Sequence, residues 1–234
     1  MARNFDGTND NLTAPDNSSS GLDNNDISLA FWYKKANQPG GTSEIVFLTM
    51  TQAGGGGRYI VRAGAPASSG FRLEFVPSFS TTNGLWLTGD VAVNTWTHFA
   101  ITYNRSLTTN DPIVYVNGTS VSLTESTTPV GTGNTGGDTV RMGENATNAS
   151  DMEGVLTHVC AIGGTVFSAA NVNVARWWGR PIGGLQIYYS LITTKLGNDG
   201  SDAAALTATG TTVVADTTPV VRPGSAMLGM GVGW

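Results

Sequence analysis

Few side chains in this sequence could carry out chemistry, and they stand apart from one another. The closest pair of carboxylates is Asp151-x-Glu153, a spacing that would place both on one face of a strand. Such a pair can act as acid and nucleophile, or it can bind calcium. The same acids lie beside Asn148 and Gly154, a composition typical of a solvated turn before the apolar run that starts at Val155. We favour the turn and expect no catalytic centre there.

The two histidines and the single cysteine lie within apolar runs. His98 and His158 would need partners from elsewhere in the chain to act as bases or metal ligands, so a satisfied buried histidine is the simpler interpretation. Cys160 is predicted to be a buried, inert thiol. The glycine run 54–57 lacks the Lys-Ser/Thr of a phosphate loop, and no G-x-S-x-G motif occurs. We therefore predict that the protein is not an enzyme, with no catalytic residue and no cofactor.

Composition narrows the class of protein further. The 234 residues include 40% hydrophobic residues, enough to bury a sizeable core, and only 12% charged residues against a usual ~25%. The net charge is −5, and no basic cluster suits nucleic acid. No apolar run approaches the ~18 residues of a membrane span. The start has no apolar leader segment, so we expect no cleaved signal peptide and no membrane partner.

Alternation of apolar and polar residues is the dominant pattern, and it predicts short strands separated by Gly, Asn and Asp turns. In the first long run Ile27, Leu29, Phe31 and Tyr33 share one face. The predicted strands are Ile27–Lys35, Glu44–Met50, Arg58–Arg62, Phe71–Val76, Trp96–Tyr103, Ile113–Val116, Thr139–Gly143, Val155–Ile162, Leu185–Leu191 and Leu206–Val214. The pattern favours an all-β fold, an antiparallel β-sandwich of the jelly-roll type.

Two segments depart from the strand pattern. Ser168 can cap one short helix over Ala169–Trp178, which Gly179 would end. The residues 219–234 alternate glycine with Leu, Met, Val and Trp, so they form an extended C-terminal tail that packs on its own domain or docks on a neighbour. We expect a single jelly-roll domain over residues 1–218, followed by this tail.

Several segments, in their order and spacing, resemble laminin G-like and concanavalin A-like jelly-roll domains. They are Phe5-Asp6-Gly7-Thr8-Asn9-Asp10, Ile27–Tyr33, Trp96–Tyr103, Val114–Gly118, Val140–Gly143, Met152–Ile162 and residues 167–172. The resemblance covers a core of about 4–178. A β extension over about 185–218 is similar to one in two-part chains that are frequent among bacteriophage virion proteins.

The resemblance implies a structural role in a virus particle. We expect a non-enzymatic virion protein, most simply a capsid decoration protein, which binds capsid or tail proteins and assembles in the host cytoplasm. Self-association into a homo-oligomer is expected as well. Candidate interface residues are the apolar and aromatic side chains of the helix end and the tail, Trp177, Trp178, Leu228, Met230 and Trp234.

The alternative is a carbohydrate-binding, lectin-like module for adsorption to glycans. Sugars stack on exposed aromatic faces, and Trp32, Trp96 and His98 lie on the less apolar alternation of their strands. These residues could line a concave ligand face, or they could be core of the second sheet, which we favour. Glucanases of this architecture carry an E-x-D-x-E cluster, which this sequence lacks.

Calcium is the remaining expectation that the resemblance raises. Oxygen ligands could come from Asp6 and Asp10, or from Asp138 and Glu144. Neither set forms a dense acidic loop, and Asp6-Gly7 is explained more simply as a hairpin turn. We therefore assign no metal site.

Overall fold

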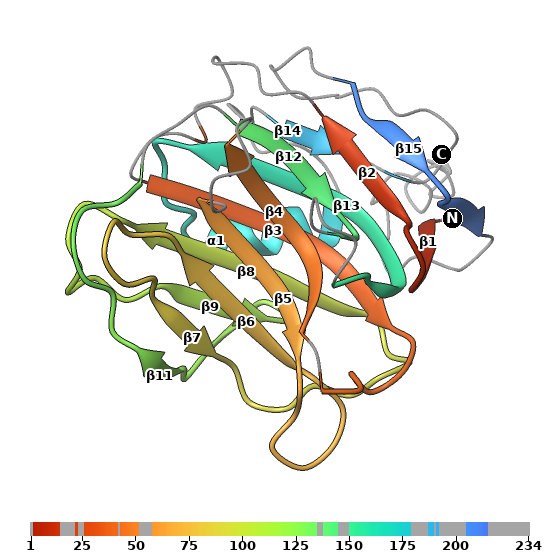
Figure 1. The fold of residues 1–234 in the computed structure, drawn as a ribbon, viewed down its shortest axis with the longest axis horizontal. Coiled ribbons are helices and arrows are strands. Elements are labelled where there is room, and N and C mark those ends of the chain that lie inside the picture. Colours follow the sequence, from red (N-terminus) through yellow and green to blue (C-terminus); the bar gives the residue numbers. More distant parts are fainter. Residues whose placement is uncertain are drawn as a thin grey trace, which may run out of the picture.

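The computed structural model describes residues 2–14, 22, 26–41, 43–51, 58–134, 138–144, 150–178, 187–189, 191 and 205–214. They form two antiparallel sheets and one helix (Figure 1). Sheet A contains, in spatial order, β10 (Thr119–Val121), β9 (Ile113–Val116), β8 (Thr97–Asn104), β3 (Asp26–Lys35), β13 (Glu153–Gly163), β1 (Ala2–Asp6) and β16 (Thr212–Val214), and β14 (Ile187–Tyr189) also pairs with β13. The all-β antiparallel sandwich expected from the sequence is confirmed.

Sheet B packs against sheet A. In spatial order it contains β11 (Thr124–Thr127), β7 (Leu85–Leu87), β6 (Arg72–Pro77), β5 (Tyr59–Gly64), β4 (Glu44–Thr51), β12 (Asp138–Met142), β2 (Asn11–Ala14) and β15 (Thr207–Thr209). Within the described part of the chain, no helix is long and apolar enough to cross a membrane.

The core between the sheets is built from the alternating residues of the long strands. Ile27, Leu29, Phe31 and Tyr33 of β3 are each no more than 2% exposed. Phe31 packs on Phe99 of β8 with ring centroids 5.6 Å apart, and Tyr33 meets a ring of the sheet B side, Phe71, at 5.7 Å. Burying a side chain of this size stabilises the fold by about 1.5–3 kcal/mol.

A helix covers the opposite face of sheet A. α1 (Ala169–Trp178) has the bounds expected from the sequence, and the Ser168 hydroxyl caps it by accepting the Asn171 N–H at 3.2 Å. Its buried residues Val172 and Ala175 form a second apolar cluster with sheet residues that include Ala30, Ala100 and Cys160. Sheet A is therefore covered on both faces around β3 and β8.

A β-bulge in β13 explains a break in the alternation of that strand. Thr157 pairs with Trp32 and Cys160 pairs with Ala30, so two residues of β13 lie opposite one of β3. His158 adopts a positive φ of 50° at this point. The extra residue shifts the phase, and Leu156 and Val159 consequently both reach the inter-sheet core.

The sequence pattern missed five short strands, namely β1, β2, β7, β10 and β11, and it merged two others. The run expected over Leu206–Val214 is two strands in different sheets, because the chain crosses from β15 in sheet B to β16 in sheet A at Gly210, whose φ is 74°. Such a φ is readily accessible to glycine. The tail over 219–234 lies outside the described residues.

One buried ion pair connects the two sheets. Lys35 of β3 has a fully buried side chain, and its ammonium lies 2.8 Å from the Glu44 carboxylate of β4. The same ammonium donates to the Glu153 carbonyl at 3.1 Å, and Glu44 accepts the Glu153 N–H at 2.9 Å. Three strands, β3, β4 and β13, are thereby held at one point.

The ion pair gives a test of the fold. Replacing Glu44 with Gln leaves the buried ammonium of Lys35 without its counter-charge, and we expect a loss of about 3–5 kcal/mol in the free energy of unfolding. Urea denaturation at neutral pH measures this loss. The matched control is Glu74→Gln, which breaks a 2.9 Å pair with Arg62, whose side chain is 30% exposed. That variant should lose less than Glu44→Gln does, because the cation that it leaves unpaired is partly exposed to solvent, and equal losses in both variants would contradict the assigned role of Lys35.

Candidate functional site

Two of the three aromatic residues proposed for sugar binding, Trp32 and His98, lie beneath the helix rather than on an open face. Trp32 is 4% exposed, and its indole N–H donates to the Arg176 carbonyl of α1 at 3.2 Å. His98 is 1% exposed and meets the Trp32 ring edge-on at 5.3 Å. Trp96 is half-buried just before β8, with the Lys34 ammonium 5.9 Å from its ring centroid. Neither Trp32 nor His98 offers a face to a ligand, so the core interpretation is the one that fits.

Burial also suppresses the chemistry of His98 and Cys160. Desolvation, with smaller contributions from the charges of Arg176 and His158, lowers the pKa of His98 from 6.5 to about 3. Its imidazole is therefore neutral at physiological pH. Burial raises the pKa of the Cys160 thiol to about 12, which leaves it protonated and unreactive. The burial of Cys160 expected from the sequence is confirmed.

The depressed pKa of His98 predicts how stability depends on pH. Between pH 6.5 and about 3 the unfolded chain binds a proton at this position and the folded chain does not. The His98 contribution to stability is therefore present above pH 6.5 and falls as the pH drops, by up to about 1.4 kcal/mol per pH unit. Thermal unfolding of wild type and His98→Gln from neutral to mildly acidic pH measures the difference. Parallel pH profiles would contradict the prediction.

The first proposed calcium pair forms a hydrogen-bonded turn. The Asp10 carboxylate accepts the Asp6 N–H at 2.8 Å, and the Asp6 carboxylate accepts the Thr8 N–H at 2.9 Å. Burial is the main cause that raises the pKa of Asp10, and the charges of Asp6 and Asp151 add to it. The contacts agree with the turn that the sequence indicated at Asp6-Gly7.

The second proposed calcium pair, Asp138 and Glu144, also forms no metal site among the residues that the structure describes. Glu144 is 3% exposed, accepts from Arg141 at 3.0 Å and from the Asn11 side-chain amide at 2.8 Å. Asp138 begins β12, and its side chain lies outside those described. Among the residues that the structure describes, no group of three or more His, Cys, Asp or Glu side chains is arranged to hold a metal ion.

Asp151 and Glu153 have structural contacts. The Asp151 carboxylate accepts the Asn9 N–H at 3.2 Å, and the Glu153 carboxylate accepts from the Asn37 side-chain amide at 2.6 Å. Glu153 also belongs to the Lys35 network through its backbone. These contacts fit the interpretation of a turn before β13.

The proposed interface residues fall mostly outside the described part of the chain. Trp177 and Trp178 form the end of α1, and their side chains are not among those described. Leu228, Met230 and Trp234 lie in the segment 215–234, also outside the described residues. Their proposed role remains a prediction.

The structure instead places a groove where the edge strands of the two sheets meet. Its volume is about 250 Å³, and it is lined by Trp86, Asp111, Pro112, Ile113, Val121, Leu123 and Glu125. These residues come from β7 and β11 at the edge of sheet B and from the β9–β10 region at the edge of sheet A. The groove is thus built by three segments that are separated in the sequence.

Local turn chemistry positions the sheet A side of the groove. Asn117 and Gly118 have φ values of 53° and 84°, the pair of positive values that a tight Asn-Gly hairpin turn requires. A Cβ on Gly118 would lie 2.7 Å from the Asn173 side-chain oxygen of α1, so this position also needs glycine for close approach. The turn sends β10 back along β9, and the chain then continues directly into β11 of sheet B.

A braced loop holds Asp111 over the indole of Trp86. The Asn110 side-chain amide donates to the Asn104 carbonyl at 3.0 Å, and the Asn104 side chain accepts the Ser106 N–H at 2.9 Å. The Asp111 carboxylate in turn accepts the Trp86 indole N–H at 3.3 Å. This contact fixes the carboxylate at one end of the groove.

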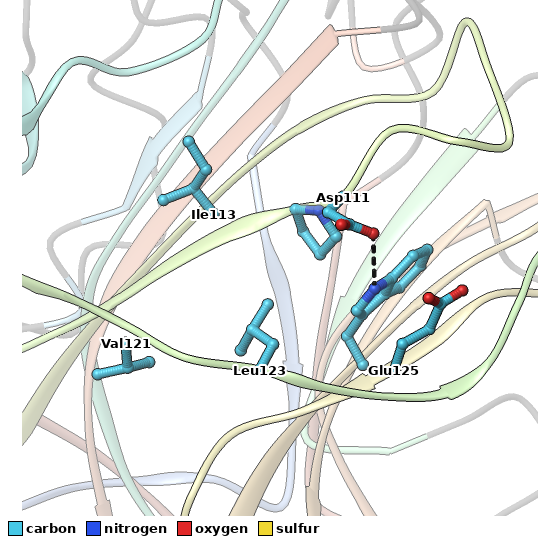
Figure 2. Close-up of a pocket in the computed structure, with 7 residues that line it drawn as sticks. Asp111, Ile113, Val121, Leu123 and Glu125 are labelled. Carbon is cyan, nitrogen blue, oxygen red and sulfur yellow. Dashed lines mark hydrogen bonds between the residues drawn. The ribbon is translucent and has the colours of Figure 1, made fainter.

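The groove has a polar end and an apolar end. Figure 2 shows Asp111 and Glu125 gathered around the indole, while Ile113, Val121 and Leu123 lie toward the other end. Val121 and Leu123 pack on the main core, and Ile113 is 47% exposed. The arrangement can accept hydrogen bonds at one end and cover an apolar surface at the other.

Sequence reasoning missed this site, although one signal was available. The Asn117-Gly118 turn marked a hairpin, but Trp86, Asp111 and Glu125 share no local motif. Only the register of the edge strands brings them together.

Two antiparallel sheets packed face to face are the architecture of a β-sandwich of the jelly-roll type. The family profile described as the concanavalin A-like lectin/glucanases superfamily matches residues 6–173. The chain belongs to this superfamily, and the laminin G-like and concanavalin A-like resemblance is confirmed. No curated protein matches the chain.

Solved structures show the same fold at low sequence identity. A candidate carbohydrate-binding protein from Bacteroides ovatus aligns over 94% of this chain and 61% of its own, with a TM-score of 0.65 and 17% identity. A native heptameric SAP-like pentraxin from Limulus polyphemus aligns over 74% and 80%, with a TM-score of 0.55 and 14% identity. The binding domain of Paraclostridial Mosquitocidal Protein 1 aligns over 74% and 42%, at 0.52 and 13%. These similarities establish the fold.

Proposed function

We propose that this chain is a non-catalytic carbohydrate-binding module and that the edge groove holds its ligand. The observation that carries the proposal is the groove itself, which pairs two carboxylates with an aliphatic surface in a chain of the lectin/glucanase superfamily. Its volume of about 250 Å³ lies slightly below the ~300–1,000 Å³ of drug-sized sites, so it suits a single sugar residue of a longer glycan.

The chemistry of the groove matches a saccharide. Sugar hydroxyls donate hydrogen bonds, and Asp111 and Glu125 are exposed acceptors. The C–H face of a sugar ring is apolar and can cover Ile113 and Leu123. Fold similarity to the candidate carbohydrate-binding protein from Bacteroides ovatus supports the same class of ligand by analogy.

Glycoside hydrolases also place two carboxylates beside the bound sugar, one as general acid and one as nucleophile or base. We assign them to binding because the Asp111 carboxylate already accepts the indole N–H of Trp86. Asp151 and Glu153, the pair of acids closest to each other in the sequence, accept hydrogen bonds from Asn9 and Asn37. Release of reducing ends from a bound polysaccharide, lost in Asp111→Asn, would instead establish an enzyme.

The virion hypothesis remains a prediction from sequence resemblance. The decoration role, the capsid or tail partners, the homo-oligomer and the location in a particle all depended on the phage-like extension and the tail, and the tail lies outside the described residues. The glycan-binding role is favoured because it rests on a described site.

Blocking the groove tests the proposed function. Ile113 is 47% exposed, so Ile113→Arg should fold normally while its long side chain fills the groove. On a panel of neutral, amino-bearing and acidic glycans, the wild type should bind at least one class, and the variant should lose more than about tenfold in affinity, or about 1.4 kcal/mol. Affinity electrophoresis and calorimetry measure the change.

Val166→Arg is the matched control. Val166 is 45% exposed and lies just before α1, away from the groove lining. This variant adds the same charge and should bind as wild type does. Absence of binding to every glycan, or unchanged binding in Ile113→Arg, would overturn the proposed function.

A further inference from the structure

The charge of the groove is one-sided. Its lining residues in the described part of the chain include two carboxylates, Asp111 and Glu125, and no Lys, Arg or His. Neither acid forms an ion pair with a described residue; Asp111 accepts only a neutral indole N–H. The chain as a whole carries a net charge of −5, so no general positive field offsets them.

A buried phenol lies beside the groove. Tyr103 packs against the Trp86 ring at 5.7 Å and is 1% exposed. Burial is the main cause that raises the pKa of Tyr103; Tyr59 adds to the rise, the charge of Arg105 opposes it, and the charges of Asp111 and Glu125 make smaller contributions to the rise. Arg105 is itself 1% exposed and does not line the groove. Both carboxylates therefore act on the same small region around the indole.

We propose that the groove selects a sugar residue that carries a free amine, such as glucosamine within a longer glycan, over its N-acetylated or neutral counterpart. This inference rests on the proposed function and names its ligand class. A protonated amine offers three N–H donors, and the polar end of the groove offers two carboxylates to receive them (Figure 2).

The rest of the sugar residue fits the rest of the groove. With the ammonium placed between Asp111 and Glu125, the ring extends toward Ile113, Val121 and Leu123, which can cover its C–H face. An acidic sugar placed the same way would bring like charges together. The groove thus favours a cation, tolerates a neutral hydroxyl and disfavours an anion.

The test compares three oligosaccharides of equal length with the same β-1,4-linked glucose backbone. Their second carbon carries a free amine (chitosan), an acetylated amine (chitin) or a hydroxyl (cellulose). Calorimetry in mildly acidic, low-salt buffer should give an affinity for the amine about five- to tenfold above the other two, as two solvent-exposed ion pairs allow. Raising the salt to about 0.5 M should remove most of this preference.

Two isosteric variants locate the effect. Asp111→Asn and Glu125→Gln keep the shape of the groove, and the side-chain amide introduced by Asp111→Asn retains an oxygen for the Trp86 indole. Each variant should lower the affinity for the amine-bearing oligosaccharide about two- to fivefold more than it lowers the affinity for the cellulose oligosaccharide. Asp6→Asn is the charge-matched control. Asp6 lies in β1, next to the edge strand of sheet A that is opposite the groove. It should have no effect.

The outcomes separate the two proposals. Equal affinities for all three oligosaccharides, with loss of all three in Ile113→Arg, would overturn the amine selectivity and retain the carbohydrate-binding groove. An amine preference that persists in both isosteric variants would also overturn this inference. Failure of every oligosaccharide and every other glycan to bind the wild type would overturn the proposed function itself.

Discussion

Burial of both faces of the central strands is the constraint on which this structure depends. In β3 one set of alternating side chains, with Leu29 and Phe31, enters the core between the sheets. The other set, with Ala30 and Trp32, lies beneath α1. A strand covered on both sides is stabilised strongly but has no surface left to present to a ligand.

Side chains at the edges of the sandwich stay accessible, as Ile113 of β9 does. At one edge the Asn117-Gly118 turn folds β10 onto β9, and the chain then passes from sheet A to sheet B. The passage leaves the side chains of both edges facing a shared groove. The hydrogen-bonded loop that holds Asp111 forms one end of the groove.

Much of the fold could be predicted from the sequence, because strand alternation has a strict period of two. Most of the long strands followed it, with a phase shift at the bulge of β13, and the helix α1 was found from its cap and its spacing. The strands β7, β10 and β11 were missed since three or four residues are too few to show an alternation. Cover by α1 was not foreseen for Trp32 and His98, because alternation shows which residues share a face and not what lies against it.

The candidate site was harder to predict for a physical reason. Trp86, Asp111 and Glu125 come from a strand, a loop and another strand, and only pairing between β7 and β11 and between β8 and β9 brings them close. The spacing of these three residues along the sequence does not indicate that they lie close together in the fold. The turn at Asn117-Gly118 could be predicted from the sequence. A turn alone does not show which strands lie beside the hairpin that it forms.

The crossing at Gly210 has a consequence for the biogenesis of the chain. β15 and β16 pair with β2 and β1, which would otherwise be the outermost strands of their sheets. Both margins therefore stay unpaired until the ribosome has released residues 207–214, long after β1 and β2. A nascent or prematurely terminated chain would display two open hydrogen-bonding rows at once, the kind of surface through which sheets of separate molecules join into aggregates.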